Sequence, residues 1–383
     1  MPETVIVATG RSPIGRAHKG SLVDVRPDDL VGDIVKRVLD KVPELPREDI
    51  EDLICGCGYP AREQGMNIGR LAVFLSGLPD SVPGTTVNRF CASSLQAIRM
   101  AHQAIQSGEG EVFVCAGVES FTRTGRGGSE DNRNPRLQPP QFPVDAYITM
   151  GLTAEHVADR YGVTREAMDA YAYGSQMRAA AARDSGVFDR EILPVTTAGG
   201  NVVAKDDGIR ADTTPDKLAA LEPVFREGGR VTAGNACPLN DGAAAVVVMS
   251  DTRAKELGIK PLARIVATAV SGLDPEIMGV GPIEACRKVL KKTGMTVDDI
   301  DVVELNEAFA SQVLAVSREL EWDMERLNPH GGAIALGHPF GMTGARIMTT
   351  LLNDLQTLDK TYGLETMCVG GGQGMAAVIE RLN

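Results

Sequence analysis

The distribution of hydrophobic positions along the chain predicts strands that alternate with helices. Short apolar runs at residues 5–9, 111–116 and 376–380 have the length of buried strands, whereas residues 91–106 and 343–355 are predicted to be helices. Strands that alternate with helices are typical of a mainly parallel sheet with helices packed against it. The sequence therefore predicts an α/β fold.

The predicted elements occur twice, in the same order and about 250 residues apart. Four pairs of short segments resemble each other, namely 6–9 and 265–268, 36–41 and 287–292, 48–54 and 298–304, and 114–117 and 367–370. Each copy is predicted to run strand, helix, strand, helix, strand. We therefore expect two duplicated βαβαβ halves, residues 1–119 and 249–383, stacked in layers around a pseudo-twofold axis.

A segment of different composition, residues 120–248, separates the two halves. Its first part is rich in Gly, Pro and polar residues, as loops are, and residues 155–182 are predicted to be helical. Because the segment interrupts the repeat, we expect an inserted loop domain that covers a site shared by the halves and returns to the core. Four arginines of this segment belong either to a solvated loop or to an interface between subunits, and the interface is slightly favoured: Arg123, Arg126, Arg133 and Arg136.

Charge and composition narrow the functional classes. The chain of 383 residues has a formal net charge of −12, which argues against nucleic acid as a general partner, because phosphate binding needs a basic face. No apolar run reaches the roughly 18 residues of a membrane span, and the first residues do not resemble a secretory signal. Seven cysteines without a disulfide framework are expected to be free thiols, and the cytoplasm is the expected compartment.

Two residues that precede predicted helices are candidates for acid–base and nucleophilic chemistry. Cys91 stands at a helix N-terminus, where the helix dipole favours the reactive thiolate, although a buried structural cysteine is the alternative. His338 stands in a Gly-rich turn at nearly the same place in the second repeat, so the two residues can meet across the pseudo-twofold axis. Histidine supplies a base or a hydrogen-bond donor near neutral pH, whereas the alternative is a local turn contact.

Two further candidates follow predicted strands. Cys368 precedes a run of glycines, among them Gly370, whose backbone can approach a ligand and present N–H groups. A dinucleotide loop is a rival interpretation, but its spacing differs and a strand follows where a helix is needed; a tight turn is the other alternative. Asn306 follows a strand and can hold a water, donate to an oxyanion or cap a helix. Cys55 and Cys57 lack a second pair at metal-ligating spacing.

Taken together, five motifs resemble the thiolases, the acyl-CoA acetyltransferases, over essentially the whole chain. They lie in family order at residues 88–94, 232–244, 306–309, 337–339 and 368–372. No single motif is specific, but five in order are. The resemblance implies the thiolase fold, with its inserted loop domain.

The resemblance also implies a role for each candidate. Cys91 is implied to be the nucleophile that takes the acyl group as a thioester. His338 is implied to activate it and, with a water held by Asn306, to bind the thioester oxygen. Cys368 is implied to be the acid/base, and the N–H groups of Cys91 and Gly370 to form a second oxyanion hole. A nucleophile, a separate acid/base and oxyanion donors are what carbon–carbon bond formation beside a carbonyl requires.

The substrate contacts implied by the resemblance lie mostly in the inserted segment. Arg210 matches a contact to the nucleotide end of coenzyme A, and Met150 matches a residue near the acyl group. Cys237 stands where the family often has Ser near the pantetheine. Lys217 lies near another position where Ser is expected, and His330 replaces a common Asn. These departures concern the acyl pocket and the coenzyme A contacts, not the chemistry.

The sequence thus predicts a coenzyme A-dependent thiolase that cleaves 3-ketoacyl-CoA, as in fatty acid β-oxidation, or joins two molecules of acetyl-CoA. Coenzyme A is expected as a substrate, with no metal or prosthetic group, and the enzyme is expected to be a homodimer or homotetramer. A ketoacyl-synthase-like condensing enzyme is an alternative, against which Cys368 argues, because that family uses one Cys with two His. A non-catalytic acyl-CoA binding protein and a nucleotide-dependent oxidoreductase are the others.

Overall fold

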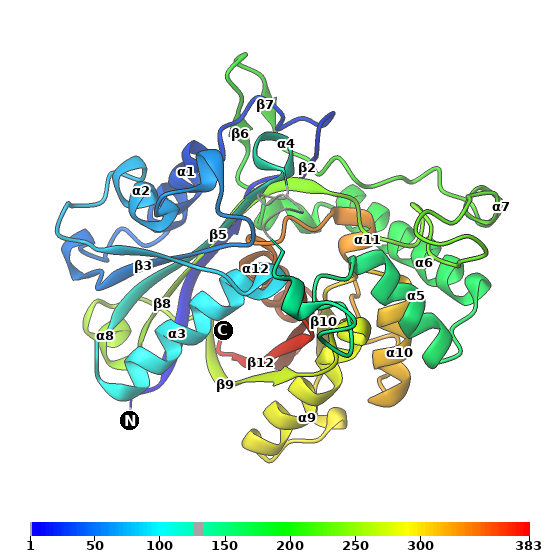
Figure 1. The fold of residues 1–383 in the computed structure, drawn as a ribbon. Helices are drawn as coiled ribbons and strands as arrows, with labels where there is room; N and C mark the ends of the chain where they lie inside the picture. Colours follow the sequence, from blue (N-terminus) through cyan, green and yellow to red (C-terminus); the bar gives the residue numbers. More distant parts are fainter. Residues whose placement is uncertain (1, 126–132) are drawn as a thin grey trace.

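One mixed sheet runs through the computed structural model, which describes residues 2–125 and 133–383 (Figure 1). Among these residues, ten strands follow the order β10-β11-β12-β9-β1-β8-β5-β3-β4, with β2 beside β8. The strands are β1 (Thr4–Arg11), β2 (Gly15–Arg16), β3 (Asp52–Cys57), β4 (Gly84–Val87), β5 (Val112–Ser120), β8 (Asn240–Ser250), β9 (Ala263–Gly272), β10 (Val302–Leu305), β11 (Tyr362–Val369) and β12 (Gln373–Arg381). A separate short ribbon consists of β6 (Val195–Thr196) and β7 (Val202–Val203).

The expectation of a mainly parallel sheet is wrong. Only the pairs β3–β4, β3–β5 and β10–β11 are parallel, and the other pairs in this sheet are antiparallel. The parallel pairs are those whose strands are joined through helices, as the sequence pattern indicates. The antiparallel pairs arise because β12 follows β11 through a tight turn, because β8 enters the first half from the inserted segment, and because β1 and β9, the first strands of the two halves, pair in opposite directions.

The duplication predicted from the sequence is present. The succession β1-α1-β3-α3-β5 of the first half recurs as β9-α9-β10-α12-β11 in the second. An isolated parallel bridge between Val303 and Leu327 stands where the first half has β4. The helices are α1 (Pro27–Leu39), α2 (Ile68–Leu75), α3 (Ser93–Ser107), α4 (Phe121–Thr124), α5 (Met150–Arg160), α6 (Arg165–Asp184), α7 (Pro215–Ala219), α8 (Asp251–Glu256), α9 (Gly281–Thr293), α10 (Ala310–Glu319), α11 (Ala333–Leu336) and α12 (Thr343–Thr357).

The elements are stacked in layers with α3 and α12 in the middle. Helix α1 packs on β1, β5 and β8, and α9 packs on β9, β11 and β12. Helix α12 contacts strands of both halves, and every residue from Thr343 to Leu355 is buried. A helix that is buried on all sides has no polar face, which explains why its sequence lacks the charged stripe of a surface helix.

The two central helices touch at a glycine. A Cβ atom at Gly344 would lie 2.3 Å from the backbone nitrogen of Leu95, so any larger residue would push α12 away from α3. Beside this point, the N–H of Ala345 donates a hydrogen bond to Ser94 Oγ at 2.9 Å. The turns that precede the two helices are therefore held close together.

The inserted segment differs from its predicted form in one respect. The helical stretch expected at residues 155–182 is two helices, α5 and α6, which are separated at Gly162 by a backbone φ of 61°. Glycine adopts this left-handed conformation without steric cost, so it ends α5 and lets the chain change direction. The segment's last strand, β8, lies between β1 and β5 in the first half.

A buried ion-pair cluster fastens this segment to the first half. The Arg11 side chain is fully buried, and it lies 2.7 Å from a carboxylate oxygen of Glu191 and 2.7 Å from one of Asp206. Asp206 also accepts a hydrogen bond from the N–H of Ile14 at 2.8 Å. Two buried carboxylates thus depend on one guanidinium for their charge balance.

We predict that Arg11→Met lowers the free energy of unfolding by about 3–5 kcal/mol, because it leaves Glu191 and Asp206 buried without a counter-charge. Urea denaturation of the purified variants measures the change. Arg183→Met is the matched control, since Arg183 and its partner Asp184 are partly exposed to solvent, which screens their attraction, so the loss of stability should be much smaller. Equal losses in the two variants would contradict the importance of the buried cluster.

Candidate active site

Cys91 lies in a short 3-10 turn, Phe90–Ala92, between β4 and α3. Its relative exposure is only 4%, and burial raises the pKa of its thiol to about 12. Hydrogen bonds from the backbone N–H groups of Gly370 and of Cys91 itself oppose this rise. Burial therefore outweighs these hydrogen bonds and favours the neutral thiol in the free protein, and the effect of the helix dipole on the thiolate stays a prediction.

His338 lies in the turn between α11 and α12, and its ring is held from both sides. Its Nδ1 lies 2.7 Å from Thr343 Oγ1, which donates its own proton to the carbonyl of Pro339 at 2.8 Å. Thr343 therefore accepts the Nδ1 proton, and Nε2 keeps its lone pair. Burial, with the charge of Arg346 as a second cause, lowers the pKa of His338 to about 3, so the ring is neutral.

Asn306 follows β10 and faces the unprotonated side of this ring. Its Nδ2 lies 3.3 Å from His338 Nε2, and its Oδ1 is buried with no hydrogen-bond partner among the described residues. Asn306 is not a helix cap, because α10 begins at Ala310 after Phe309. A buried acceptor without a protein partner is normally satisfied by water, and Asn306 can hold such a water beside His338.

Cys368 stands near the end of β11, just before the turn that joins β11 to β12. Its pKa is raised by burial and then by the neighbouring thiols of Cys91 and Cys237. In the turn, Gly372 has a φ of 79°, and a Cβ atom there would lie 2.2 Å from the carbonyl oxygen of Leu273. A strand follows this turn, so the glycine run is not a dinucleotide loop, which would open a helix.

Two predicted substrate contacts lie at the same place. A Cβ atom at Gly370 would lie 3.4 Å from the Phe90 ring and 3.8 Å from Met150 Sδ, which brings the first residue of α5 to the turn. The pKa of Cys237 is raised by burial and by Cys91. The structure thus brings three thiols together, whereas the sequence alone connects only two of them.

Arg210 and Lys217 lie apart from these buried groups, in an exposed part of the inserted segment. Lys217 Nζ pairs with a carboxylate oxygen of Asp212 at 2.8 Å, and the backbone N–H of Arg210 donates to Gln176 Oε1 at 2.8 Å. His330 lies elsewhere, with its Nδ1 2.5 Å from an oxygen of Asp354.

Sequence reasoning missed Thr343 and the buried carboxylate of Glu119. Glu119 accepts hydrogen bonds from the N–H groups of Gly58, at 2.8 Å, and of Gly341, at 2.9 Å. It thereby ties the loop after β3 to the turn that carries His338. Glu119 has no local signal, because it acts on segments that are distant in sequence. Thr343 lies only five residues after His338, so its place in the same turn was a signal that could have found it.

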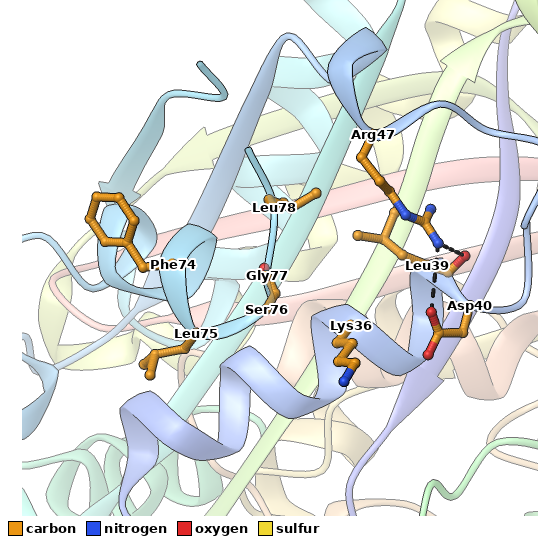
Figure 2. Close-up of a pocket in the computed structure, with 9 residues that line it drawn as sticks. All are labelled: Lys36, Leu39, Asp40, Arg47, Phe74, Leu75, Ser76, Gly77 and Leu78. Carbon is orange, nitrogen blue, oxygen red and sulfur yellow. Dashed lines mark hydrogen bonds and ion pairs between the residues drawn. The ribbon is translucent and has the colours of Figure 1, made fainter. Parts of the chain in front are cut away.

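One groove on the surface lies apart from this cluster. A groove of about 420 Å³ lies between α1 and α2, and Figure 2 shows its lining residues. Its guanidinium, that of Arg47, is already engaged with Asp40 and with the carbonyl of Leu39. In the part of the chain that the structure describes, no group of three or more His, Cys, Asp or Glu is arranged to hold a metal ion.

The buried cluster combines a thiol, an unprotonated imidazole nitrogen, a second thiol and backbone donors beside the first sulfur. An enzyme that transfers acyl groups through a cysteine needs these groups: a nucleophile, an acid–base group and donors for the developing oxyanion. Comparison with known proteins agrees. Residues 4–252 match the thiolase N-terminal domain, and residues 259–381 match the thiolase C-terminal domain. The chain belongs to the thiolase family, whose members are acyltransferases.

Individual relatives are similar over their whole length. A 3-ketoacyl-CoA thiolase of Bacillus subtilis is 44% identical, with 99% of this chain and 100% of that protein covered. A beta-ketoadipyl-CoA thiolase of Acinetobacter baylyi is 43% identical, with both chains fully covered. The crystal structure of the Bacillus anthracis acetyl-CoA acetyltransferase superimposes with a TM-score of 0.91 at 41% identity, covering 100% of this chain and 99% of that one. These matches do not favour a ketoacyl synthase or a binding protein.

We predict that Thr343→Val lowers kcat by about 10–100-fold, because His338 loses the acceptor that fixes its Nδ1 proton. Thr343→Ser keeps the hydroxyl and should stay within about threefold of the wild type, which separates proton placement from packing. Steady-state kinetics with a 3-ketoacyl-CoA substrate measures both variants. If Ser and Val at this position are equally impaired, the hydroxyl does not act through His338.

We also predict that iodoacetamide labels Cys91 first among the seven cysteines, and that acetyl-CoA protects it. Because only the thiolate reacts and the pKa of Cys91 is raised to about 12, the rate should rise about tenfold per pH unit from about pH 7 to about pH 9. Peptide mapping by mass spectrometry follows the label. A rate that does not change over this range would instead indicate a thiolate–imidazolium pair.

Proposed function

We propose that the protein is a thiolase that transfers acyl groups between coenzyme A thioesters through an acyl group carried on Cys91. The observation that supports this most strongly is the arrangement around its sulfur. The N–H groups of Gly370 and Cys91 point at Sγ, and a second buried thiol, Cys368, lies beside it. The named relatives favour the thiolytic direction on 3-ketoacyl-CoA, and the reverse condensation of two molecules of acetyl-CoA uses the same groups.

In the proposed thiolysis, Cys91 attacks the 3-keto carbon of the substrate while its proton passes to Nε2 of His338. The lone pair on Nε2 supports this role, as does the neutral state of both groups, because the proton then moves only during attack. The N–H groups of Cys91 and Gly370 stabilise the resulting oxyanion. The water held by Asn306, together with the now protonated Nε2, donates to the thioester oxygen.

The second thiol completes the proposed cycle. When the bond between C2 and C3 breaks, its electron pair moves to C2, and Cys368 supplies the proton that makes acetyl-CoA. The acyl group remains on Cys91 as a thioester. The thiol of an incoming coenzyme A then gives its proton to Cys368 and attacks the acyl carbon, which releases acyl-CoA from the sulfur of Cys91. That sulfur takes the proton back from Nε2 of His338, so both cysteines and the neutral imidazole are restored. Coenzyme A is thus a substrate, and no resident cofactor takes part.

We assign substrate binding to the inserted loop domain, residues 120–248. Arg210 and Lys217 are exposed cations in this segment. Their side chains can form charge-assisted hydrogen bonds with the phosphates of coenzyme A. Met150 borders the turn at Gly370, which supports a contact with the acyl group. Cys237 lies beside the reacting thiol, which supports a contact with the pantetheine end.

We further propose a homodimer or homotetramer that works in the cytoplasm. Strand β4 ends the sheet and pairs only with β3 among the described residues, so it offers an open edge beside the turn of Cys91. The arginine-bearing loop is a second candidate contact, although Arg126 lies outside the described residues. Seven free cysteines suit a reducing compartment. No helix within the described residues is long and apolar enough to cross a membrane.

Replacing each reactive thiol separately tests the division of labour. Cys91→Ala removes the atom that carries the acyl group, so no acetyl adduct should form with acetyl-CoA. Cys368→Ala should still form the adduct, while thiolysis slows by about 10²–10⁴-fold, as expected for loss of an acid–base group. Intact-protein mass spectrometry and thiolysis assays measure the two effects.

Cys286→Ala is the matched control, because Cys286 is a fully buried thiol of α9 in the hydrophobic core. It should keep both the adduct and the activity. If Cys91→Ala still carries an acetyl group, or if both active-site variants lose the adduct alike, the proposed roles are wrong.

A further inference from the structure

A cationic cleft lies between α3, β9 and α9, on a molecule whose net charge is −12. Its volume is about 430 Å³, and it is lined by Arg99, Lys288, Lys291 and Lys292 above Ala269 and Val270. In Figure 1, α9 and β9 lie at the bottom of the molecule and α3 at the lower left, whereas α7, which follows the segment of Arg210 in the chain, lies at the upper right. The cleft is therefore distinct from the proposed coenzyme A contacts.

The four cations of the cleft have no acidic partners. Within the described ranges, none of them forms an ion pair with a carboxylate. This is usual for a lysine of these ranges, where Lys217 alone is paired, but many of the described arginines are paired, so the absence is notable for Arg99. Lys288 and Lys292 donate only to the carbonyls of Val270, at 3.3 Å, and of Thr268, at 2.9 Å. An ammonium group has three N–H donors, so each keeps donors for a ligand.

Among the four cations, Arg99 has a buried hydrogen-bond donor that lacks an acceptor in the described part of the chain. Its Nε is buried and has no hydrogen-bond partner among the described residues. Its pKa is lowered by burial and then by Arg89, and the pKa of His102 is lowered by burial and then by Lys292 and Arg99. The positive charges of Arg89 and Arg99 therefore repel each other, and an anion bound at Arg99 would relieve both this repulsion and the lost hydration.

A helix dipole does not account for the whole arrangement. Lys291 and Lys292 lie in the last turn of α9, where basic residues are favoured by the dipole. Arg99, however, stands in the middle of α3, in the first half of the chain, and points at the same cleft. Convergence of cations from two halves of a duplicated fold is better explained by a ligand.

We propose that this cleft binds a small phosphorylated ligand with at least two phosphate groups. Two such groups carry about 3–4 negative charges near pH 7, which matches the four cations. The volume falls in the range of about 300–1,000 Å³ that small-molecule sites occupy, and it leaves room for an organic group over Ala269 and Val270. The planar guanidinium of Arg99 can bind one phosphate through two hydrogen bonds, while the lysines supply point charges.

Isothermal titration calorimetry with inorganic pyrophosphate tests the proposal on the full chain. Arg99→Gln combined with Lys291→Gln removes two charges from opposite walls without changing the hydrogen bonds of Lys288 and Lys292 to β9. Binding should weaken by at least about tenfold, because removing one charge-assisted hydrogen bond costs about that factor in affinity. Lys288→Gln combined with Lys291→Gln changes α9 alone, so it tests the cleft even if a change in α3 perturbs folding.

The matched control removes the same charge at the other end of the molecule. Lys19→Gln combined with Lys205→Gln changes two exposed residues near β2 and β7, and should shift the affinity by less than about twofold, since distant surface charges are screened by salt. Saturating coenzyme A should leave pyrophosphate binding intact. The proposal is overturned if the wild type does not bind pyrophosphate, if the cleft variants bind as well as the control, or if coenzyme A displaces the pyrophosphate.

Discussion

The crossing of α3 and α12 is the contact on which the rest of the site depends. Each helix is the equivalent element of one half, and the two meet where Gly344 lies against the backbone of Leu95. This approach places the turn of Cys91 and the turn of His338 in the same buried region, although about 250 residues separate them in sequence. A side chain at Gly344 would have to displace the backbone of Leu95 rather than a flexible side chain. The close packing of the core and the approach of the two site turns therefore depend on the same glycine.

Burial at this crossing also sets the charge state of the reactive groups. The thiol of Cys91 and the imidazole of His338 are both neutral because neither can be hydrated as an ion. Neutral groups do not hold each other through an ion pair, so their orientation comes from hydrogen bonds to Thr343 and Asn306 and from the ties that Glu119 makes to Gly58 and Gly341. The charge that develops during acyl transfer then meets N–H donors that are already in place.

Charged side chains in the core and in the surface cleft differ in whether they have partners of opposite charge. Buried charges such as Arg11 are matched by carboxylates, whereas Arg99 and the lysines of α9 are left without acidic partners on an otherwise acidic chain. The cleft lies at the junction of the two halves, as the reactive thiols do, but on another face. The duplicated fold therefore creates two places where residues of both halves converge, and the proposed ligands of both carry phosphate.

Local sequence patterns determined the elements of each half, the duplication, and the motifs that place the protein among the thiolases, because these depend on the spacing of residues that are near one another in the chain. The motifs also singled out Cys91, His338, Asn306, Cys368 and Gly370. Tertiary structure alone decided the antiparallel course of β8 and β12, the pKa of Cys91 and the tautomer of His338. It also decided the positions of Thr343, Glu119 and Arg99. Most of these features depend on the exclusion of water and on contacts between segments that are distant in the chain, which no local pattern records. The contact between Thr343 and His338 is local in sequence, but only the folded turn brings the hydroxyl to Nδ1.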